Sequence, residues 1–211
     1  MEPEAIWTAI EAQRRSLADL LAGLAPSEWT VHSLCAGWTV KDVAAHLTLS
    51  TVGIREAVPA LLRARGKFDT MIHQTAVARA GERTTEQLVA ELREIAASRR
   101  HPPGTRPIDP LVDVLVHGQD IARPLGQDRP IPTDAAVAAA ARVWQKKLPH
   151  AARKRFAGVR FEATDAPVAL GEGTPATGPI AAILLVISGR PTGLADLSGP
   201  GAALASRALA G

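Results

Sequence analysis

Apolar residues recur at intervals of three and four along most of this 211-residue chain. That spacing places them on one face of an α-helix, so it predicts helices that pack through apolar stripes. The clearest case is the segment 4–24, where the spacing is kept by Ile6, Ile10, Leu17, Leu20, Leu21 and Leu24. Aromatic residues make up only 3% of the chain and tyrosine is absent, which favours close-packed helices over a β-sandwich.

Capping residues and breaks divide the following sequence into further predicted helices. These helices are expected over residues 40–57, 67–80, 85–99 and 110–123. Thr39 and Asp42 resemble a capping box, with Asp in place of the usual Glu. The run His-Pro-Pro-Gly at 101–104 is a firm break. Asp109 is expected to be an N-cap, with Pro110 at the first helical position.

The character of the sequence changes near residue 128. The later elements are expected to be an Ala-rich helix at 134–147, a strand at 159–164 with a partner at 167–170, a buried helix at 180–188 and a short helix ending near 208. The glycine-containing segments 171–173 and 178–179 are interpreted as turns. We therefore predict a mainly α protein, with a helical domain at 1–128 and a small α+β domain at 129–211.

Charge and cysteine content limit the function classes. The net charge of +3 is small for this length and does not indicate nucleic-acid binding. The basic stretch 146–155 is interpreted as a solvated helix end, with an anion contact as the alternative. Cys35 is the only cysteine, which fits a reducing compartment, and it is interpreted as a small core residue rather than a nucleophile.

Membrane insertion is not expected. The longest strongly apolar run, residues 180–187, is far too short to span a bilayer, and the N-terminus lacks a signal-peptide pattern. We therefore expect a soluble, cytoplasmic protein without a membrane partner.

Three residues suggest a metal site. Asp113 and His117 stand four residues apart, which places them one turn apart on one helix face. His46 lies in a separate apolar run. Two imidazoles and one carboxylate with room for water form the ligand set of an open divalent-metal site.

Each of these residues also has a commoner explanation. A lone buried histidine is usually a satisfied core residue, and an Asp–His pair is usually a hydrogen-bonded pair. However, all three lie within apolar runs, where a buried polar group needs a partner. Asp120, three residues after His117, is expected either to hold that imidazole or to bond the backbone.

Several segments resemble one known family. They are Trp29 with residues 33–47, residues 113–122, and residues 178–201. These segments resemble the signatures of the mycothiol-dependent maleylpyruvate isomerase family, which belongs to the DinB-like superfamily. The similarity extends over nearly the whole chain.

The resemblance implies a DinB-like four-helix bundle followed by a small α/β domain. It also implies a divalent metal, usually zinc, held by one histidine from the second helix and a carboxylate–histidine pair from the fourth. His46, Asp113 and His117 match those positions. The family pattern has Glu where this chain has Asp113. Because Asp is one methylene shorter, Asp113 either ligates after a small helix shift, ligates through water or does not ligate.

The implied activity is that of a metal- and mycothiol-dependent isomerase or S-transferase acting on a small electrophilic metabolite. In an isomerase the thiolate adds to a cis double bond, the bond rotates and the thiol leaves; in a transferase the thiol stays attached. Arg190 could clamp a substrate carboxylate or the thiol cofactor, or else it closes the C-terminus of its helix. The loop 29–38 is expected to border the pocket, where His32 and Trp38 could contact a ligand, although packing is the favoured role for Trp38.

Two other functions remain open. One is a non-catalytic module that binds a small ligand or a protein. The other is a hydrolase that uses the same metal ligands and a bound water. The sequence leaves the substrate open, and a homodimer is compatible with it.

Overall fold

The computed structural model describes residues 1–51, 53, 59, 67–146 and 151–210. The chain divides into two compact units, Glu2–Arg129 and Pro130–Gly211. The sequence analysis predicted two domains, 1–128 and 129–211. That each of them folds by itself stays a prediction.

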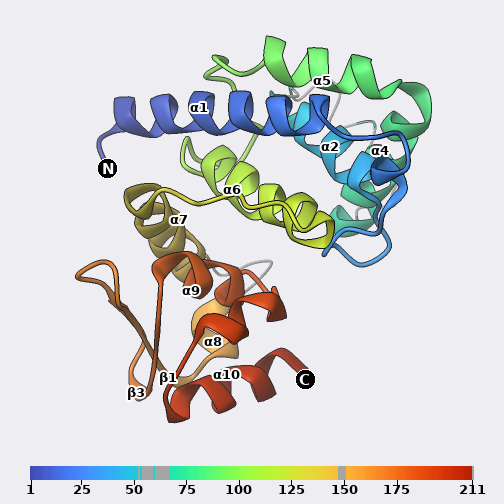
Figure 1. Ribbon diagram of the computed structural model, residues 1–211. Helices are drawn as coiled ribbons and strands as arrows, with labels where there is room; N and C mark the ends of the chain where they lie inside the picture. The colour runs from blue at the N-terminus through green and yellow to red at the C-terminus, as the bar shows by residue number, and fades with distance from the viewer. Residues whose placement is uncertain (52, 54–58, 60–66, 147–150, 211) are drawn as a thin grey trace. The chain divides into compact units, whose positions relative to one another are not determined.

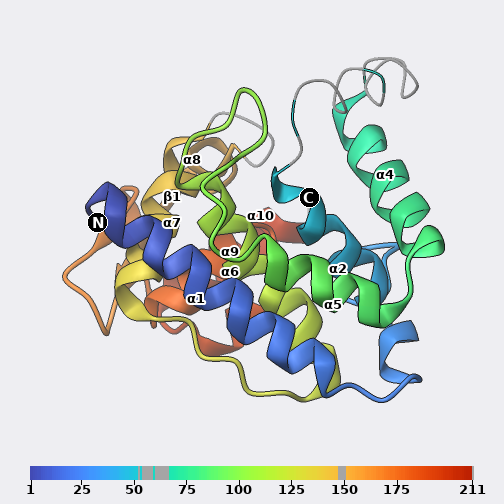
Figure 2. The same cartoon turned by 90° about the horizontal axis from the view of Figure 1, so that it is seen from above.

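The first unit is helical. Its described α-helices are α1 (Pro3–Ala22), α2 (Val40–Thr48), α4 (Phe68–Glu82), α5 (Thr85–Glu94) and α6 (Asp109–Ala122) (Figure 1). Helix α1 packs against α5 and α6, and α2 packs against α4, α5 and α6 (Figure 2). The apolar stripe predicted for the first helix faces this core, because Ile10, Leu17 and Leu21 are buried. The predicted helical bundle is therefore confirmed.

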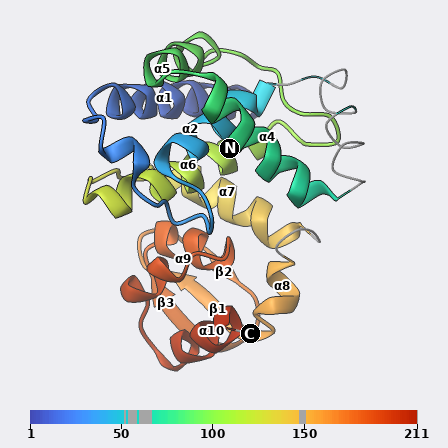
Figure 3. The same ribbon diagram turned by 90° about the vertical axis from the view of Figure 1, so that its right-hand side faces the viewer.

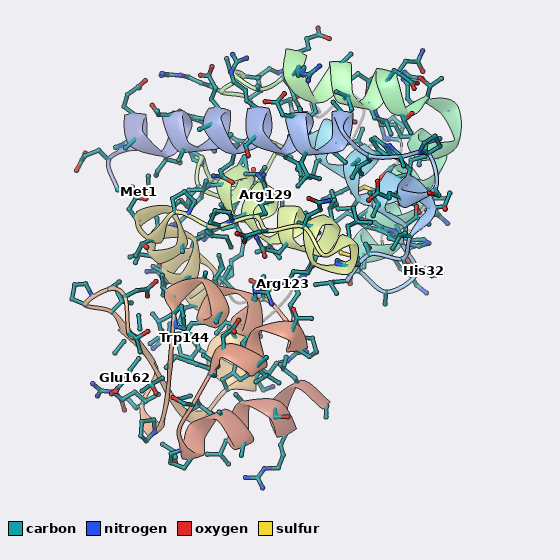
Figure 4. All side chains as sticks on the ribbon, in the orientation of Figure 1. Met1, His32, Arg123, Arg129, Trp144 and Glu162 are labelled. Carbon is teal, nitrogen blue, oxygen red and sulfur yellow. The ribbon has the colours of Figure 1, made fainter. Side chains whose placement is uncertain are left out.

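Arg129 ties two of these helices together. Its guanidinium donates to the hydroxyl of Ser16 and to the backbone and side-chain oxygens of Gln13, all on α1 (Figure 4). Its own carbonyl accepts a hydrogen bond from the side-chain amide of Gln119 on α6. Burial lowers the pKa of Arg129 to about 10, so these partners offset the cost of burying a cation.

The helix starts follow local side-chain chemistry. The Thr39 hydroxyl accepts from the Asp42 backbone N–H, and the Asp42 carboxylate accepts from the Thr39 N–H, so the predicted capping box is confirmed. The prediction that Asp109 is an N-cap is wrong, because α6 begins at Asp109 itself. Its carboxylate instead accepts from the Arg106 backbone N–H at 2.7 Å, in the turn before the helix.

Two helices are shorter than predicted. Helix α2 ends at Thr48 and is followed by the 3-10 helix η2 (Leu49–Thr51), while residues 52 and 54–58 of the prediction lie outside the described residues. Helix α5 ends at Glu94 rather than 99. The Arg14 guanidinium accounts for this early end, because it donates to the carbonyls of Ile95 and Ser98, which a longer helix would use for its own hydrogen bonds.

The second unit combines helices with a small sheet. Its described elements are α7 (Thr133–Gln145), α8 (Ala152–Arg155), β1 (Gly158–Ala163), β2 (Ala169–Leu170), β3 (Gly173–Gly178), α9 (Ile180–Ile187) and α10 (Pro200–Ala210). The central strand β1 pairs antiparallel with β2 and parallel with β3 (Figure 3). Helix α9 packs on α7 and β1, and α10 packs on β3 and β1. The mainly α class with a small α+β part is confirmed.

The sequence analysis missed strand β3 and interpreted its two ends as turns. This strand lacks the apolar alternation that marks strands, since it reads Gly-Thr-Pro-Ala-Thr-Gly. Gly173 has a φ of +121°, and a Cβ there would lie 2.3 Å from the carbonyl oxygen of Gly158. The glycine that suggested a turn is therefore what allows two strands to approach closely.

Among the described residues, no helix is both long and apolar enough to cross a membrane. The short basic helix α8 was not predicted as a helix, and its Arg153, Lys154 and Arg155 are exposed.

Candidate metal centre

The structure brings together the three residues that the sequence suggested as metal ligands. His46 comes from α2, and Asp113 and His117 come from α6. Each offers one ligand atom, and these atoms all lie within 4.8 Å of one another. The two imidazole rings meet edge to face, with their centroids 4.9 Å apart. We call this group the His46 site.

Helix periodicity and packing explain this placement. Asp113 and His117 are one turn apart on α6, while Val114 and Val116 between them are buried. Since α2 packs against α6, the half-buried His46 faces the pair on the neighbouring helix.

The donor set fits a divalent metal. Two imidazoles and a carboxylate are the ligands of open zinc sites, which keep a further position for water or substrate. Metal–ligand bonds of about 2.0–2.1 Å place the ligand atoms of a tetrahedral zinc site roughly 3.3 Å apart. The ligand atoms of the His46 site lie within 4.8 Å of one another, so closing onto an ion needs a movement of at most about 1.5 Å.

Asp120 supports one of the imidazoles. The Nδ1–H group of His117 donates to Oδ2 of Asp120 over 2.9 Å, and Asp120 is fully buried. Burial alone lowers the pKa of His117, but hydrogen bonds with Asp120 and Cys35 and their charges outweigh it and raise the pKa to about 10. Because Nδ1 is engaged by Asp120, Nε2 is the ring atom left for the His46 site. The first of the two predicted roles of Asp120 is thus the one observed.

Cys35 contacts the same carboxylate. Its thiol donates to Oδ2 of Asp120 over 3.0 Å and lies 3.5 Å from Nδ1 of His117. The sequence analysis interpreted Cys35 as a small core residue. That interpretation is wrong, because the side chain is half-buried and has polar partners beside the site.

Trp38 covers the site on one side. Its indole is 7% exposed, and its ring centroid lies 5.3 Å from that of His46 and 6.3 Å from that of His117. The indole N–H donates to Nδ1 of His73 on α4 over 2.6 Å. The contact with His73 was missed, because the sequence does not show that α4 packs against α2.

His32, the other residue of this loop that was expected to contact a ligand, is exposed (Figure 4). It pairs through its backbone with Thr39. Its proposed contact with a ligand stays a prediction.

Arg14 is a further residue that the sequence analysis missed. It is 2% exposed and donates to the carbonyls of Ile95 and Ser98 and to the hydroxyl of Ser50. Burial lowers its pKa to about 10, while the nearby Asp113 carboxylate acts in the opposite direction. A signal was present: Arg14 lies four residues after Ile10 and three before Leu17, within the apolar stripe.

Arg190, the predicted catalytic residue, lies in the second unit just after α9. Its guanidinium donates to the carbonyl of Ser188 over 2.7 Å, at the end of that helix. This contact corresponds to the helix-closing role. The clamp for a carboxylate or a thiol cofactor stays a prediction.

Comparisons with known proteins agree with this architecture. Residues 10–107 match the family model of the mycothiol maleylpyruvate isomerase N-terminal domain. The crystal structure of the mycothiol-dependent maleylpyruvate isomerase is similar, with a TM-score of 0.59, 17% identity and 90% of each chain covered. A variant of that isomerase with one histidine replaced by alanine gives a TM-score of 0.59 at 16% identity, again over 90% of each chain.

No curated protein sequence matches this chain significantly. At such low identity the two structures establish the fold alone, and they confirm the predicted DinB-like fold class. Residues 10–107 are therefore similar to the mycothiol maleylpyruvate isomerase N-terminal domain, within a chain that has the fold of that isomerase.

Proposed function

We propose that this protein is a metal- and mycothiol-dependent enzyme that isomerises a small electrophilic metabolite or transfers the thiol to it. The observation that supports this most is the convergence of His46, Asp113 and His117, with Asp120 holding the His117 ring. The match of residues 10–107 to the mycothiol maleylpyruvate isomerase N-terminal domain supports mycothiol as the thiol.

In this proposal His46, Asp113 and His117 hold one divalent ion, most naturally zinc. When bound, such an ion lowers the pKa of a nearby thiol, so that thiolate is available near neutral pH. Asp120 fixes the tautomer and orientation of the His117 ring, which presents Nε2 to the site.

Two other residues shape the electrostatics of the site. The ring of Trp38 lies against both imidazoles and is nearly buried, so it keeps bulk water away from that side. The Arg14 guanidinium acts on Asp113 from within the core, so the site contains a fixed positive charge. A positive charge in a poorly solvated site favours an anionic nucleophile such as a thiolate.

The related enzyme of known structure is a maleylpyruvate isomerase, according to its description. Small unsaturated acids with a cis double bond are therefore the first substrate class to test on this chain. Epoxides and alkyl halides are the corresponding class for thiol transfer.

The first experiment measures metal content by elemental mass spectrometry on tag-free protein. We expect about one divalent ion per chain in the wild type and none in His117→Ala, which removes a central ligand. His32→Ala is the matched control, since that side chain is exposed, and it should keep the ion. An ion-free wild type after loading with zinc, manganese and nickel contradicts the proposal.

The second experiment tests thiol dependence. Wild-type protein loaded with metal is assayed against a panel of electrophiles with mycothiol, with another thiol and without thiol. We expect turnover that requires mycothiol and that disappears in His46→Ala. Turnover without any thiol would instead support the hydrolase, and tight ligand binding without turnover would support the binding module.

A further inference from the structure

We propose that Cys35, Asp120 and the Nδ1 atom of His117 form a second cation site, which takes a thiophilic divalent ion such as zinc. We call it the Cys35 site. It shares the His117 ring with the His46 site but uses the opposite nitrogen. The three ligand types, thiolate, carboxylate and imidazole, are all found in protein zinc sites. Thiolate makes this set softer than that of the His46 site.

The three donor atoms are already close to a zinc geometry. In a tetrahedral site, bonds of about 2.3 Å to sulfur and about 2.0–2.1 Å to nitrogen or oxygen place the ligand atoms roughly 3.3–3.6 Å apart. In this chain the Sγ–Nδ1 distance is 3.5 Å, the Sγ–Oδ2 distance is 3.0 Å and the Nδ1–Oδ2 distance is 2.9 Å. An ion therefore requires the atoms to separate by about half an ångström or less.

The backbone holds the thiol in this position. The Leu34 N–H donates to the carbonyl of Asp120 over 3.1 Å, which fastens the loop to α6. The Cys35 N–H donates to the hydroxyl of Ser33, and the Ser33 N–H donates to the carbonyl of Trp38. The Cys35 site is therefore formed before any ion binds, so little conformational entropy is lost on binding.

When a divalent ion binds the Cys35 site, the protons of the thiol and of Nδ1 pass to solvent, because only a thiolate and an unprotonated ring nitrogen are metal ligands.

The two sites exclude each other. Ions bound to the two nitrogens of one ring lie about 6 Å apart. Two divalent charges at that distance repel each other strongly in a poorly solvated site. One ion per chain therefore occupies either site. An ion in the Cys35 site therefore leaves the open His46 site without an ion. Which site holds the ion does not depend on the proposed enzyme activity.

Cobalt(II) tests this inference, because a thiolate ligand gives it a near-ultraviolet charge-transfer band that nitrogen and oxygen ligands do not. The wild type, His46→Ala and Cys35→Ser are each titrated with cobalt. We expect His46→Ala to bind about one ion per chain with a band at least as strong as that of the wild type. We expect Cys35→Ser, whose hydroxyl can still donate to Asp120, to bind cobalt without the band.

Two results overturn the Cys35 site. One is a His46→Ala protein that binds cobalt without the band, and the other is a His46→Ala protein that binds no cobalt. Far-ultraviolet circular dichroism of each variant verifies that it is folded. Because the readout is spectroscopic, a wild type that is active with mycothiol, together with a His46→Ala protein that shows no band, rejects the Cys35 site while leaving the proposed function intact.

Discussion

The Nδ1 atom of His117 lies 2.9 Å from Oδ2 of Asp120, on the next turn of α6, and that carboxylate is completely buried. A buried carboxylate behind a metal-binding imidazole fixes the ring and increases the basicity of its other nitrogen. Two unusual properties follow for this chain. The support for the metal comes from the same helix as two of the proposed ligands, and the pair is charged even when no metal is bound.

Replacing Asp120 by Asn should weaken metal binding. Asn still offers an oxygen to Nδ1 but has no charge, so we expect zinc affinity to fall by about 10- to 100-fold, the usual effect of losing such a partner. A competition titration with a chromophoric chelator measures this change. Asp128→Asn is the control, because Asp128 is exposed, and it should keep the wild-type affinity. Equal affinity of the two variants would show that Asp120 is not a support of the ligand.

The metal-free protein should lose stability at alkaline pH. The pKa of His117 is raised to about 10 by Asp120 and Cys35 against the opposing effect of burial, whereas an unfolded chain has a value near 6.5. A raised pKa stabilises the fold fully below about pH 6.5, and this contribution is lost as the pH rises to about 10. We expect it to be on the order of a few kcal/mol. Urea unfolding with chelator present, at pH 6.5 and 9.5, compares the wild type with His117→Gln. A difference between them that stays constant with pH would contradict the expectation.

Asp113→Glu should improve the His46 site. The ligand atoms of this site lie within 4.8 Å of one another, and one additional methylene lets the carboxylate reach further toward the two imidazoles. We expect zinc affinity to rise by at least about tenfold, because the site then needs less movement to close. Asp113→Asn should reduce the affinity. Weaker binding by Asp113→Glu than by the wild type would mean that the shorter side chain is already in its binding position.

The helical spacing and the two signatures were sufficient to predict the bundle and the His46 site. A period of three and four residues fixes which side chains share a face, and this placed Asp113 beside His117. The approach of His46 required only that α2 pack against α6. The extent of α5 was predicted wrongly, because its early end depends on Arg14, a residue 81 positions before Ile95 in the chain.

The neighbours of the site were harder to predict. Cys35 lies in a loop, where no periodicity shows which way a side chain points. Its distance to Asp120 depends on a backbone hydrogen bond from Leu34, which joins residues far apart in sequence. Strand β3 was missed for a different reason, since its glycines and proline are typical of turns.

Arg14→Met should destabilise the first unit strongly. The substitution removes the hydrogen bonds from a charged guanidinium to the carbonyls of Ile95 and Ser98, and hydrogen bonds of charged groups contribute about 1.5–3 kcal/mol each. We therefore expect unfolding free energy to fall by about 3 kcal/mol or more in urea unfolding. The neighbouring Arg15→Met is the control, because that side chain is 56% exposed and pairs with Glu11 at the surface. It should change stability by less than about 0.5 kcal/mol. Similar losses in both variants would show that burial of Arg14 contributes nothing specific.

Gly118→Ala and Gly81→Ala should change stability in opposite directions. A Cβ at Gly118 on α6 would lie 2.7 Å from Nε of Arg129, which is itself buried and held by Gln13, so the clash is not easily relieved. We expect a net loss of about 1–2 kcal/mol, since overpacking costs about 1–3 kcal/mol and exceeds the gain in helix propensity. A Cβ at Gly81 on α4 meets nothing within 4 Å, so that variant should gain up to about 1 kcal/mol. Urea unfolding of both variants measures the difference. Because Gly118 follows His117 directly, the Gly118→Ala variant should also bind zinc more weakly. A Gly118→Ala protein as stable as Gly81→Ala would show that Arg129 moves aside at little cost.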